Sequence, residues 1–185
     1  ALTVDSEGGA IDINSIMGAA NSDIAVILDA DASGGDVAGE TVTIGAVGSG
    51  NEIGALTITG PDGITLQGNI TLSNAAGSDL DINGAVTIDG SVTIDTDNAS
   101  ATRDGSTVHQ DGDINFSSTI DAEGTATDSL TLTSGSGTIT LGGIIGGSTA
   151  LDSFTVNSSA LTISNSITTD GGLIDINAPV TLSGS

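Results

Sequence analysis

The chain repeats a nine-residue segment in which five positions are identical and two others exchange Leu and Ile. Residues 80–88 read LDINGAVTI, and residues 174–182 read IDINAPVTL. The similarity continues upstream, where three segments of the first copy correspond to three of the second: 56–59 to 154–157, 64–66 to 161–163, and 70–72 to 167–169. A fixed repeat of short strands indicates a stacked architecture, because each unit buries its apolar edge against its neighbours. Function in such proteins lies along an extended surface rather than in one pocket.

Apolar and polar residues alternate in short runs along most of the chain, as in Val86-Thr87-Ile88. This period of two, with Thr on the polar side, is typical of half-buried strands. The aromatic residues are only Phe116 and Phe154, which favours a narrow aliphatic core. We therefore predict an all-β fold, a parallel β-solenoid with on the order of seven to nine coils of roughly 20–30 residues each. A β-sandwich is the alternative, because it also uses short strands separated by turns.

The length of 185 residues suits a single solenoid domain, residues 1–185. Two acidic segments near 29–40 and 95–113 break the alternation, and we expect both to be irregular loops. The strand patterns at 2–4 and 180–182 carry no polar capping unit. Uncapped solenoid ends expose strand edges, so we expect them to be covered by neighbouring repeats of a longer chain or by a second copy.

The tripeptide Asp-Ile-Asn occurs four times, at 12–14, 81–83, 113–115 and 175–177. In a strand, the Ile side chain would point into the core. Asn residues that recur at one corner of a solenoid form ladders of side-chain amide hydrogen bonds. Asx residues are also good turn formers in their own right. The sequence leaves these two interpretations open.

The charge balance is extreme, with 24 acidic residues, one basic side chain (Arg103) and a formal net charge of −23. Such a chain repels nucleic acids and anionic membrane surfaces. No run of about 18 apolar residues is present, so we expect no membrane insertion. Two carboxylates about 5 Å apart repel by roughly 1 kcal/mol in water, so salt or divalent cations would stabilise a rod in which acidic residues align between coils. A saline habitat is a second explanation of the acidity.

Residues 29–40 match the twelve-residue spacing of a calcium-binding loop. The ligands would be oxygens of Asp29, Asp31, Ser33, the Gly35 carbonyl and Glu40. The segments on either side have the pattern of strands and not of EF-hand helices, and a solvated acidic turn is the alternative. Calcium is the one cofactor that the sequence suggests.

A second carboxylate cluster comprises Asp95, Asp97, Asp104, Asp111 and Asp113, which we interpret as a solvated loop. The chain contains no Lys, Tyr or Trp and one His, His109. Enzymes that act on acidic polysaccharides need basic residues and aromatic platforms, so we expect the chain not to be an enzyme. Thr-x-Thr pairs such as Thr57/Thr59 and Thr131/Thr133 leave ice binding as a further alternative.

Residues 128–156 read DSLTLTSGSGTITLGGIIGGSTALDSFTV, and the pattern continues at 167–182. These segments resemble the repeats of filamentous-haemagglutinin-like large bacterial surface proteins. The resemblance is clearer over residues 125–185 and weaker over 50–95, and residues 1–50 and 95–125 depart from the repeat. It implies a secreted β-solenoid at the cell surface that serves in adhesion, cell–cell contact or an extracellular biofilm matrix. It brings no catalytic residues to this chain.

Together these observations predict a non-enzymatic, secreted structural or adhesive protein that forms a β-solenoid rod or a head-to-tail extracellular fibre. One alternative is a calcium-stabilised segment of a giant cell-surface adhesin that binds a glycan or a cell surface. The other alternative is an ice-binding solenoid.

Overall fold

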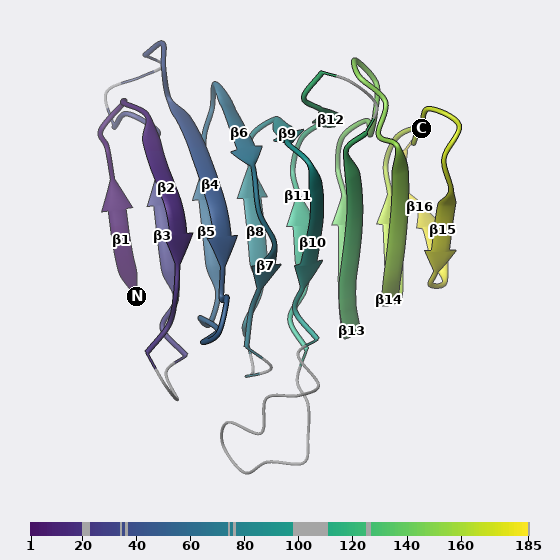
Figure 1. The fold of residues 1–185 in the computed structure, drawn as a ribbon, viewed down its shortest axis with the longest axis horizontal. Coiled ribbons are helices and arrows are strands. Elements are labelled where there is room, and N and C mark those ends of the chain that lie inside the picture. The colour runs from purple at the N-terminus through teal and green to yellow at the C-terminus, as the bar shows by residue number, and fades with distance from the viewer. Residues whose placement is uncertain are drawn as a thin grey trace.

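In the computed structural model, short strands are stacked along the long axis of the molecule from its N-terminal to its C-terminal end (Figure 1). The structure describes residues 1–19, 23–33, 35, 37–73, 75, 77–97, 111–124 and 127–184. These residues contain 16 strands and no helix. The strands are β1 (Leu2–Asp5), β2 (Ile11–Ile16), β3 (Val26–Asp29), β4 (Thr41–Val47), β5 (Leu56–Thr59), β6 (Gly63–Leu66), β7 (Ile70–Thr71), β8 (Leu80–Asn83), β9 (Val86–Ile88), β10 (Ser91–Asp95), β11 (Ile114–Phe116), β12 (Ile120–Ala122), β13 (Ser129–Leu141), β14 (Ser153–Ile163), β15 (Ile174–Asn177) and β16 (Val180–Leu182).

Each coil of the chain passes through three faces, and every strand pair is parallel. The first face contains β1, β3, β5, β8, β11, the ends of β13 and β14, and β16. The second face contains β2, the start of β4, β6, β9 and β12, and it continues through Ile145 and Ile167. The third face contains Ile16, the end of β4, β7, β10, the starts of β13 and β14, and β15.

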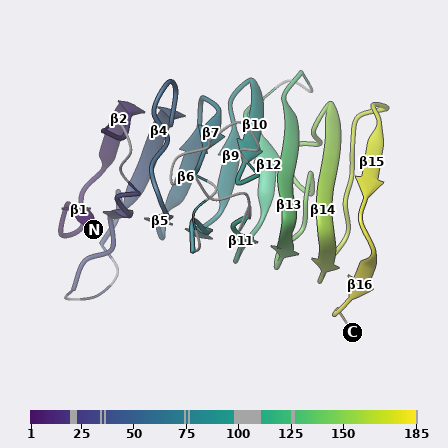
Figure 2. The same ribbon diagram turned by 90° about the horizontal axis from the view of Figure 1, so that it is seen from below.

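This parallel stacking confirms the predicted β-solenoid. The β-sandwich alternative is wrong, because a sandwich is built from two antiparallel sheets. Figure 2, turned by 90°, shows the strands arranged one behind another along the same axis, with the two termini at opposite ends.

Straight apolar columns form the core. On the first face, one column is made of buried residues in exact strand register: Val26, Leu56, Leu80, Ile114, Ile139 and Leu161. The residues that follow them in each strand point outward, as the period of two requires, and three of these six are Thr (Thr57, Thr140 and Thr162). Each buried aliphatic side chain contributes about 1.5–3 kcal/mol relative to an exposed one. The columns therefore stabilise the stack without the large aromatic core of an ordinary globular domain.

The internal repeat is not in phase with the coil. Leu80 lies on the first face, whereas its equivalent Ile174 lies on the third face. Likewise, the segment 64–66 lies on the second face and its equivalent 161–163 on the first. The two copies are thus separated by three full coils and two further faces. The internal repeat consequently contains a whole number of strands and corners but not a whole number of coils.

The same displacement relates the rest of the two halves. Residues 2–5 (LTVD) on the first face correspond to 92–95 (VTID) on the third. Residues 41–44 (TVTI) on the second face correspond to 138–141 (TITL), which lie on the first. The chain is therefore a tandem duplication, in which the second half follows the first with every segment moved by one face.

The Asp-Ile-Asn tripeptides do not form one Asn ladder. Those at 12–14, 81–83 and 175–177 lie on three different faces, and Asn115 lies opposite Asp81 rather than Asn83. Among the residues that the structure describes, one Asn–Asn amide pair is seen, in which Asn177 Nδ2 donates to Asn157 Oδ1 at 3.1 Å. The prediction that the central Ile points inward is confirmed for Ile82 and Ile114, both of which are buried.

Candidate functional site

The N-terminal end of the solenoid exposes residues that belong to core columns. Within the described ranges, Leu2 and Val4 of β1 are paired on one side only, with Val26 and Leu28 of β3. Leu2 is 55% exposed, whereas Leu56 in the same column is 0% exposed. Met17 and Ile24, which lie near this end, are also exposed. This end therefore presents an apolar strip beside an unpaired strand edge.

The C-terminal end mirrors this arrangement. Val180 and Leu182 of β16 and Ile174 of β15 continue inward-facing columns, but no further strand among the described residues covers them. Leu182 is 77% exposed, against 9% for Ile163 one coil earlier. Both ends thus expose the interior of the stack.

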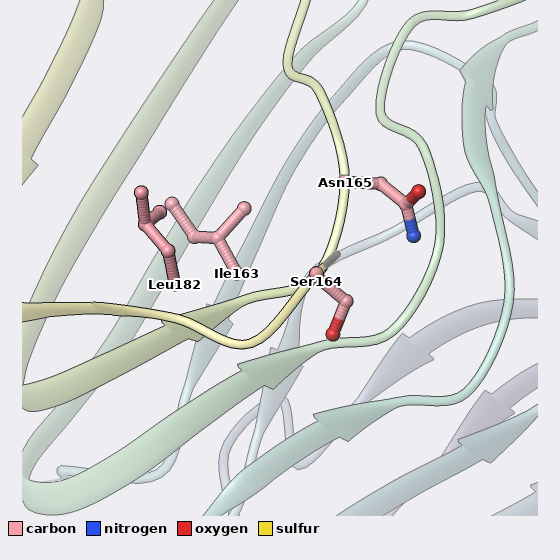
Figure 3. Close-up of a pocket in the computed structure, with 5 residues that line it drawn as sticks. Ile163, Ser164, Asn165 and Leu182 are labelled. Carbon is pink, nitrogen blue, oxygen red and sulfur yellow. The ribbon is translucent and has the colours of Figure 1, made fainter.

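A shallow pocket of about 260 Å³ lies at this C-terminal end, lined by Ile163, Ser164, Asn165, Leu182 and Gly184. Figure 3 shows the Ile163 and Leu182 side chains next to each other on the left, and the Ser164 and Asn165 side chains to the right of them. Asn165 Nδ2 donates to the Gly142 carbonyl at 2.8 Å, and the Ser164 and Ser183 hydroxyls lie 2.8 Å apart. None of the five lining residues is titratable, so the pocket offers no acid or base. It is one part of the exposed end.

The predicted calcium loop is built around an inward-pointing carboxylate. Glu40 is fully buried, and its Oε1 accepts backbone N–H bonds from Ala32 at 3.0 Å and Val37 at 3.2 Å. Its Oε2 is also buried and has no hydrogen-bond partner. Glu40 therefore holds the loop from the inside, which the spacing motif did not indicate.

The other predicted calcium ligands are more exposed. Asp29 Oδ1 accepts the Asp31 N–H at 3.1 Å, which makes an Asx turn. The Ser33 hydroxyl donates to Glu7 Oε2 at 3.0 Å, and Gly35 is exposed. Across the described part of the chain, no three Asp, Glu or His side chains are grouped to hold a metal ion. Gly34 and Asp36 lie outside the described residues, and calcium at this loop stays a prediction.

Residues on the neighbouring coils clamp this loop as well. Asp62 Oδ2 accepts the N–H of Gly39 at 2.6 Å and that of Glu40 at 3.2 Å. Sequence reasoning did not include Asp62 or Glu7 in the loop, because both are more than twenty residues away from their partners. No local sequence motif indicates that Asp62 and Glu7 contact this loop.

The second acidic segment is described only at its two ends, because Arg103, Asp104 and His109 lie outside the described residues. Asp95 Oδ1 accepts the Asp97 N–H at 2.9 Å, and Asp111 Oδ2 accepts the N–H and hydroxyl of Ser136 at 2.7 and 2.9 Å. A Cβ atom added at Gly135 would fall against both Asp97 and Asp111, so these carboxylates converge on one turn. Burial, and then the charge of Asp111, raises the pKa of Asp95, and the N–H of Asp97 partly opposes this.

Several other Asp side chains bind backbone N–H groups of an adjacent coil. Asp113 Oδ1 accepts the Thr138 N–H at 2.7 Å, and Asp121 Oδ1 accepts those of Ser148 at 2.8 Å and Thr149 at 3.2 Å. Asp128 likewise accepts the Gly90 N–H at 3.0 Å. Charge-assisted bonds of this kind satisfy donors at corners, where the strand ladder is interrupted. Part of the acidity of the chain thus has a structural use.

Comparison of the chain with models of protein families, with curated proteins and with solved structures finds no match. The function must therefore be argued from the geometry above. Among the residues that the structure describes, none belongs to a helix of the length and hydrophobicity that crossing a bilayer requires.

Proposed function

We propose that this chain is a non-enzymatic, secreted structural protein that assembles head to tail into an extracellular β-solenoid rod or fibre. The observation that carries the proposal is the exposure of the core columns at both ends. Val4 and Leu182 belong to the same first-face column, whose inner members Leu28, Ile58 and Ile82 are buried. Covering such an end with another coil buries apolar side chains and pairs the free strand edge.

The charge distribution supports contact at the ends over contact at the sides. The net charge of −23 is spread over one chain, and many of its carboxylates lie at strand faces and corners on the outer wall. Two rods that approach side by side bring like charges together, and this repulsion disfavours lateral aggregation. The ends, where apolar residues dominate, are the surfaces at which a second copy gains the most from contact.

In an alternative version, neighbouring repeats of a longer chain cover the same two apolar end surfaces. In that version, the chain is a segment of a cell-surface adhesin, and its outer wall contacts a glycan or another cell. Both versions share the architecture and the acidic wall, which is unsuited to nucleic acid. They differ in whether the isolated 185-residue chain polymerises.

Negative-stain electron microscopy of the purified chain, with calcium and with a chelator, tests the proposal. We expect long unbranched fibres. Leu2→Asp and Leu182→Asp would place a charge on an end surface and should shorten the fibres to single rods. The matched control is Ile144→Asp, at an apolar side chain that is 39% exposed and lies outside the end strands β1, β2, β15 and β16. Isolated rods for the unsubstituted chain would reject self-assembly and favour the adhesin segment.

Calcium stabilisation remains a second candidate because the buried Oε2 of Glu40 has no partner. Isothermal titration with calcium should then give a binding signal that Glu40→Gln weakens. The absence of heat at millimolar calcium would exclude the site. In the fibre experiment, loss of fibres in chelator would make the metal part of assembly.

Ice binding has a weaker basis in the geometry. Thr43, Thr65 and Thr87 stack in register on the second face, but the next outward position is Asp121. Two other Thr columns, Thr93/Thr131/Thr155 on the third face and Thr140/Thr162/Thr181 on the first, also hold three residues each. Every aligned Thr column in the described strand pairs is therefore short, and the three lie on different faces. A thermal-hysteresis assay decides this alternative, which a zero reading would eliminate.

A further inference from the structure

The two ends of the solenoid are related to an interface that already exists inside the chain, and this relationship specifies how two copies join. We infer that a second copy docks on the C-terminal end with its faces displaced by one, so that its β1 continues the second face of the first copy. The inference rests on the proposed head-to-tail assembly and adds to it the register of the junction.

The template is the contact between the two tandem halves of the chain. The first half ends on the third, first and second faces with β7, β8 and β9. The second half starts on them with β10, β11 and β12. In this internal junction Ile94 lies over Ile70, Ile114 over Leu80, and Ile120 over Val86. The duplicated sequence thus already stacks the start of one unit on the end of another.

The ends of the whole chain carry the same elements. Its last segments, around Ile167, β15 and β16, are the equivalents of β7, β8 and β9. Its first segments, β1 and β2, are the equivalents of β10 and β11. Transferring the internal register to two copies places Val4 of the second copy over Ile167 of the first, and Ile13 over Ile174. All four of these residues lie in inward-facing columns.

A polar pair checks this alignment. At the internal junction, Asn115 Nδ2 donates to Asp81 Oδ1 at 3.0 Å, from one half of the chain to the other. The equivalent residues are Asn14 in β2 and Asp175 in β15. Asn14 is exposed, and both face outward, because they alternate with the inward residues Ile13 and Ile174. The displaced register brings Asn14 of one copy opposite Asp175 of the next, where it can make the same bond.

The alternative register keeps the faces in phase and places β1 over β16. At the C-terminal end, however, the first face is one strand ahead of the other two. It reaches β16, whereas the second face stops at Ile167 and the third at β15. Docking in phase would leave one missing strand on each of these two faces, a gap of about 4.8 Å. The displaced copy fills this step and buries more apolar surface.

Disulfide trapping separates the two registers, since the chain contains no Cys. Neighbouring residues of parallel strands lie about 4.8 Å apart, which is within the Cα separation of disulfides, about 4.4–6.8 Å. We would mix the single variants Asn14→Cys and Asp175→Cys under oxidation. In parallel we would mix Thr3→Cys with Thr181→Cys, which are opposite each other only in the in-phase register. The double variant Asp81→Cys/Asn115→Cys is the intramolecular control for the same geometry.

The expected result is a disulfide-linked dimer from the Asn14→Cys and Asp175→Cys mixture. The Thr3→Cys and Thr181→Cys mixture should give no more dimer than either variant alone. Dimer in the second mixture and not in the first would overturn the displaced register while leaving head-to-tail assembly intact. Fibres with no linkage in either mixture, alongside an oxidised control, would also overturn it. If electron microscopy shows only isolated rods, the proposed function itself fails and the register falls with it.

Discussion

Asp5 lies directly opposite Asp29 in the register of β1 and β3. Elsewhere in the described strand pairs, carboxylates face Thr or Asn, as Asp81 faces Thr57 and Asn115, and Asp121 faces Thr87. Continuous acidic columns, which the composition would allow, are therefore avoided within the strands. Within the described strand register, Asp5 and Asp29 are the one pair of directly opposed carboxylates.

Asp5→Asn should stabilise the chain at low salt. Like charges directly opposite in a sheet cost about 0.2–1 kcal/mol, and Asn keeps the oxygen that accepts the Glu7 N–H. Added NaCl screens the repulsion, so we expect the melting temperature of the unsubstituted chain to rise with salt more steeply than that of the variant. Thermal unfolding at low and high NaCl measures both slopes, and equal slopes would contradict the assignment.

Glu40→Ala should destabilise the loop between β3 and β4. Removing the carboxylate leaves the partly buried N–H groups of Ala32 and Val37 without their acceptor, and the loss for each is at most the about 1–3 kcal/mol of a fully buried unsatisfied group. Glu40→Gln retains one acceptor oxygen and should lose less. Denaturant unfolding gives the two free energies, and equal losses for Ala and Gln would show that the hydrogen bonds are unimportant.

Gly45→Ala should be among the most damaging small substitutions in the chain. Gly45 lies in β4, and a Cβ atom there would overlap with the carbonyl oxygen of Asn14 in the preceding coil. We expect a loss of at least about 1–3 kcal/mol, because neither backbone can move without breaking the strand ladder. Gly124→Ala is the matched control, since nothing lies within 4 Å of its added Cβ. Unfolding curves that are the same for both variants would contradict this.

Mild acid should stabilise the folded chain. The pKa of Asp95 is raised above its ordinary value of 3.8, first by burial, and that of Glu123 above 4.5, first by the charge of Asp89. A raised pKa means that the folded state binds protons more readily, so this stabilisation is lost as pH rises through the folded-state pKa. We expect the melting temperature to increase as the pH is lowered from 7 toward the raised pKa values of these two carboxyl groups. Asp95→Asn should reduce the increase, and an unchanged pH slope in that variant would argue against the role of Asp95.

The fold was predictable because its main determinant is local. Alternation such as Val86-Thr87-Ile88 specifies a half-buried strand, and the repeated nine residues specify that such strands stack. The displacement by one face was not predictable from the repeat alone. The similar sequences around Leu80 and Ile174 would fit a strand on any of the three faces. The face on which each one lies depends on the lengths of all the corners between them.

The candidate sites were less accessible to sequence reasoning. The spacing of residues 29–40 predicted Glu40 as a calcium ligand, which stays a prediction, but it did not indicate that Glu40 is buried and that its Oε1 binds the loop backbone. Its neighbours Glu7 and Asp62 reach the loop from other coils, and no local pattern links them to it. The exposed ends, by contrast, were expected from the strand patterns at 2–4 and 180–182, which carry no polar capping unit.

In the proposed fibre, the displacement of each copy by one face would give a definite helical symmetry. Each copy adds seven coils and one additional face, so it advances the fibre by about 35 Å. Three copies return the faces to their starting phase, which predicts an axial repeat of about 105 Å. Any side-chain pattern carried by one copy would then wind around the fibre as a spiral of identical sites, and a partner could approach from every side.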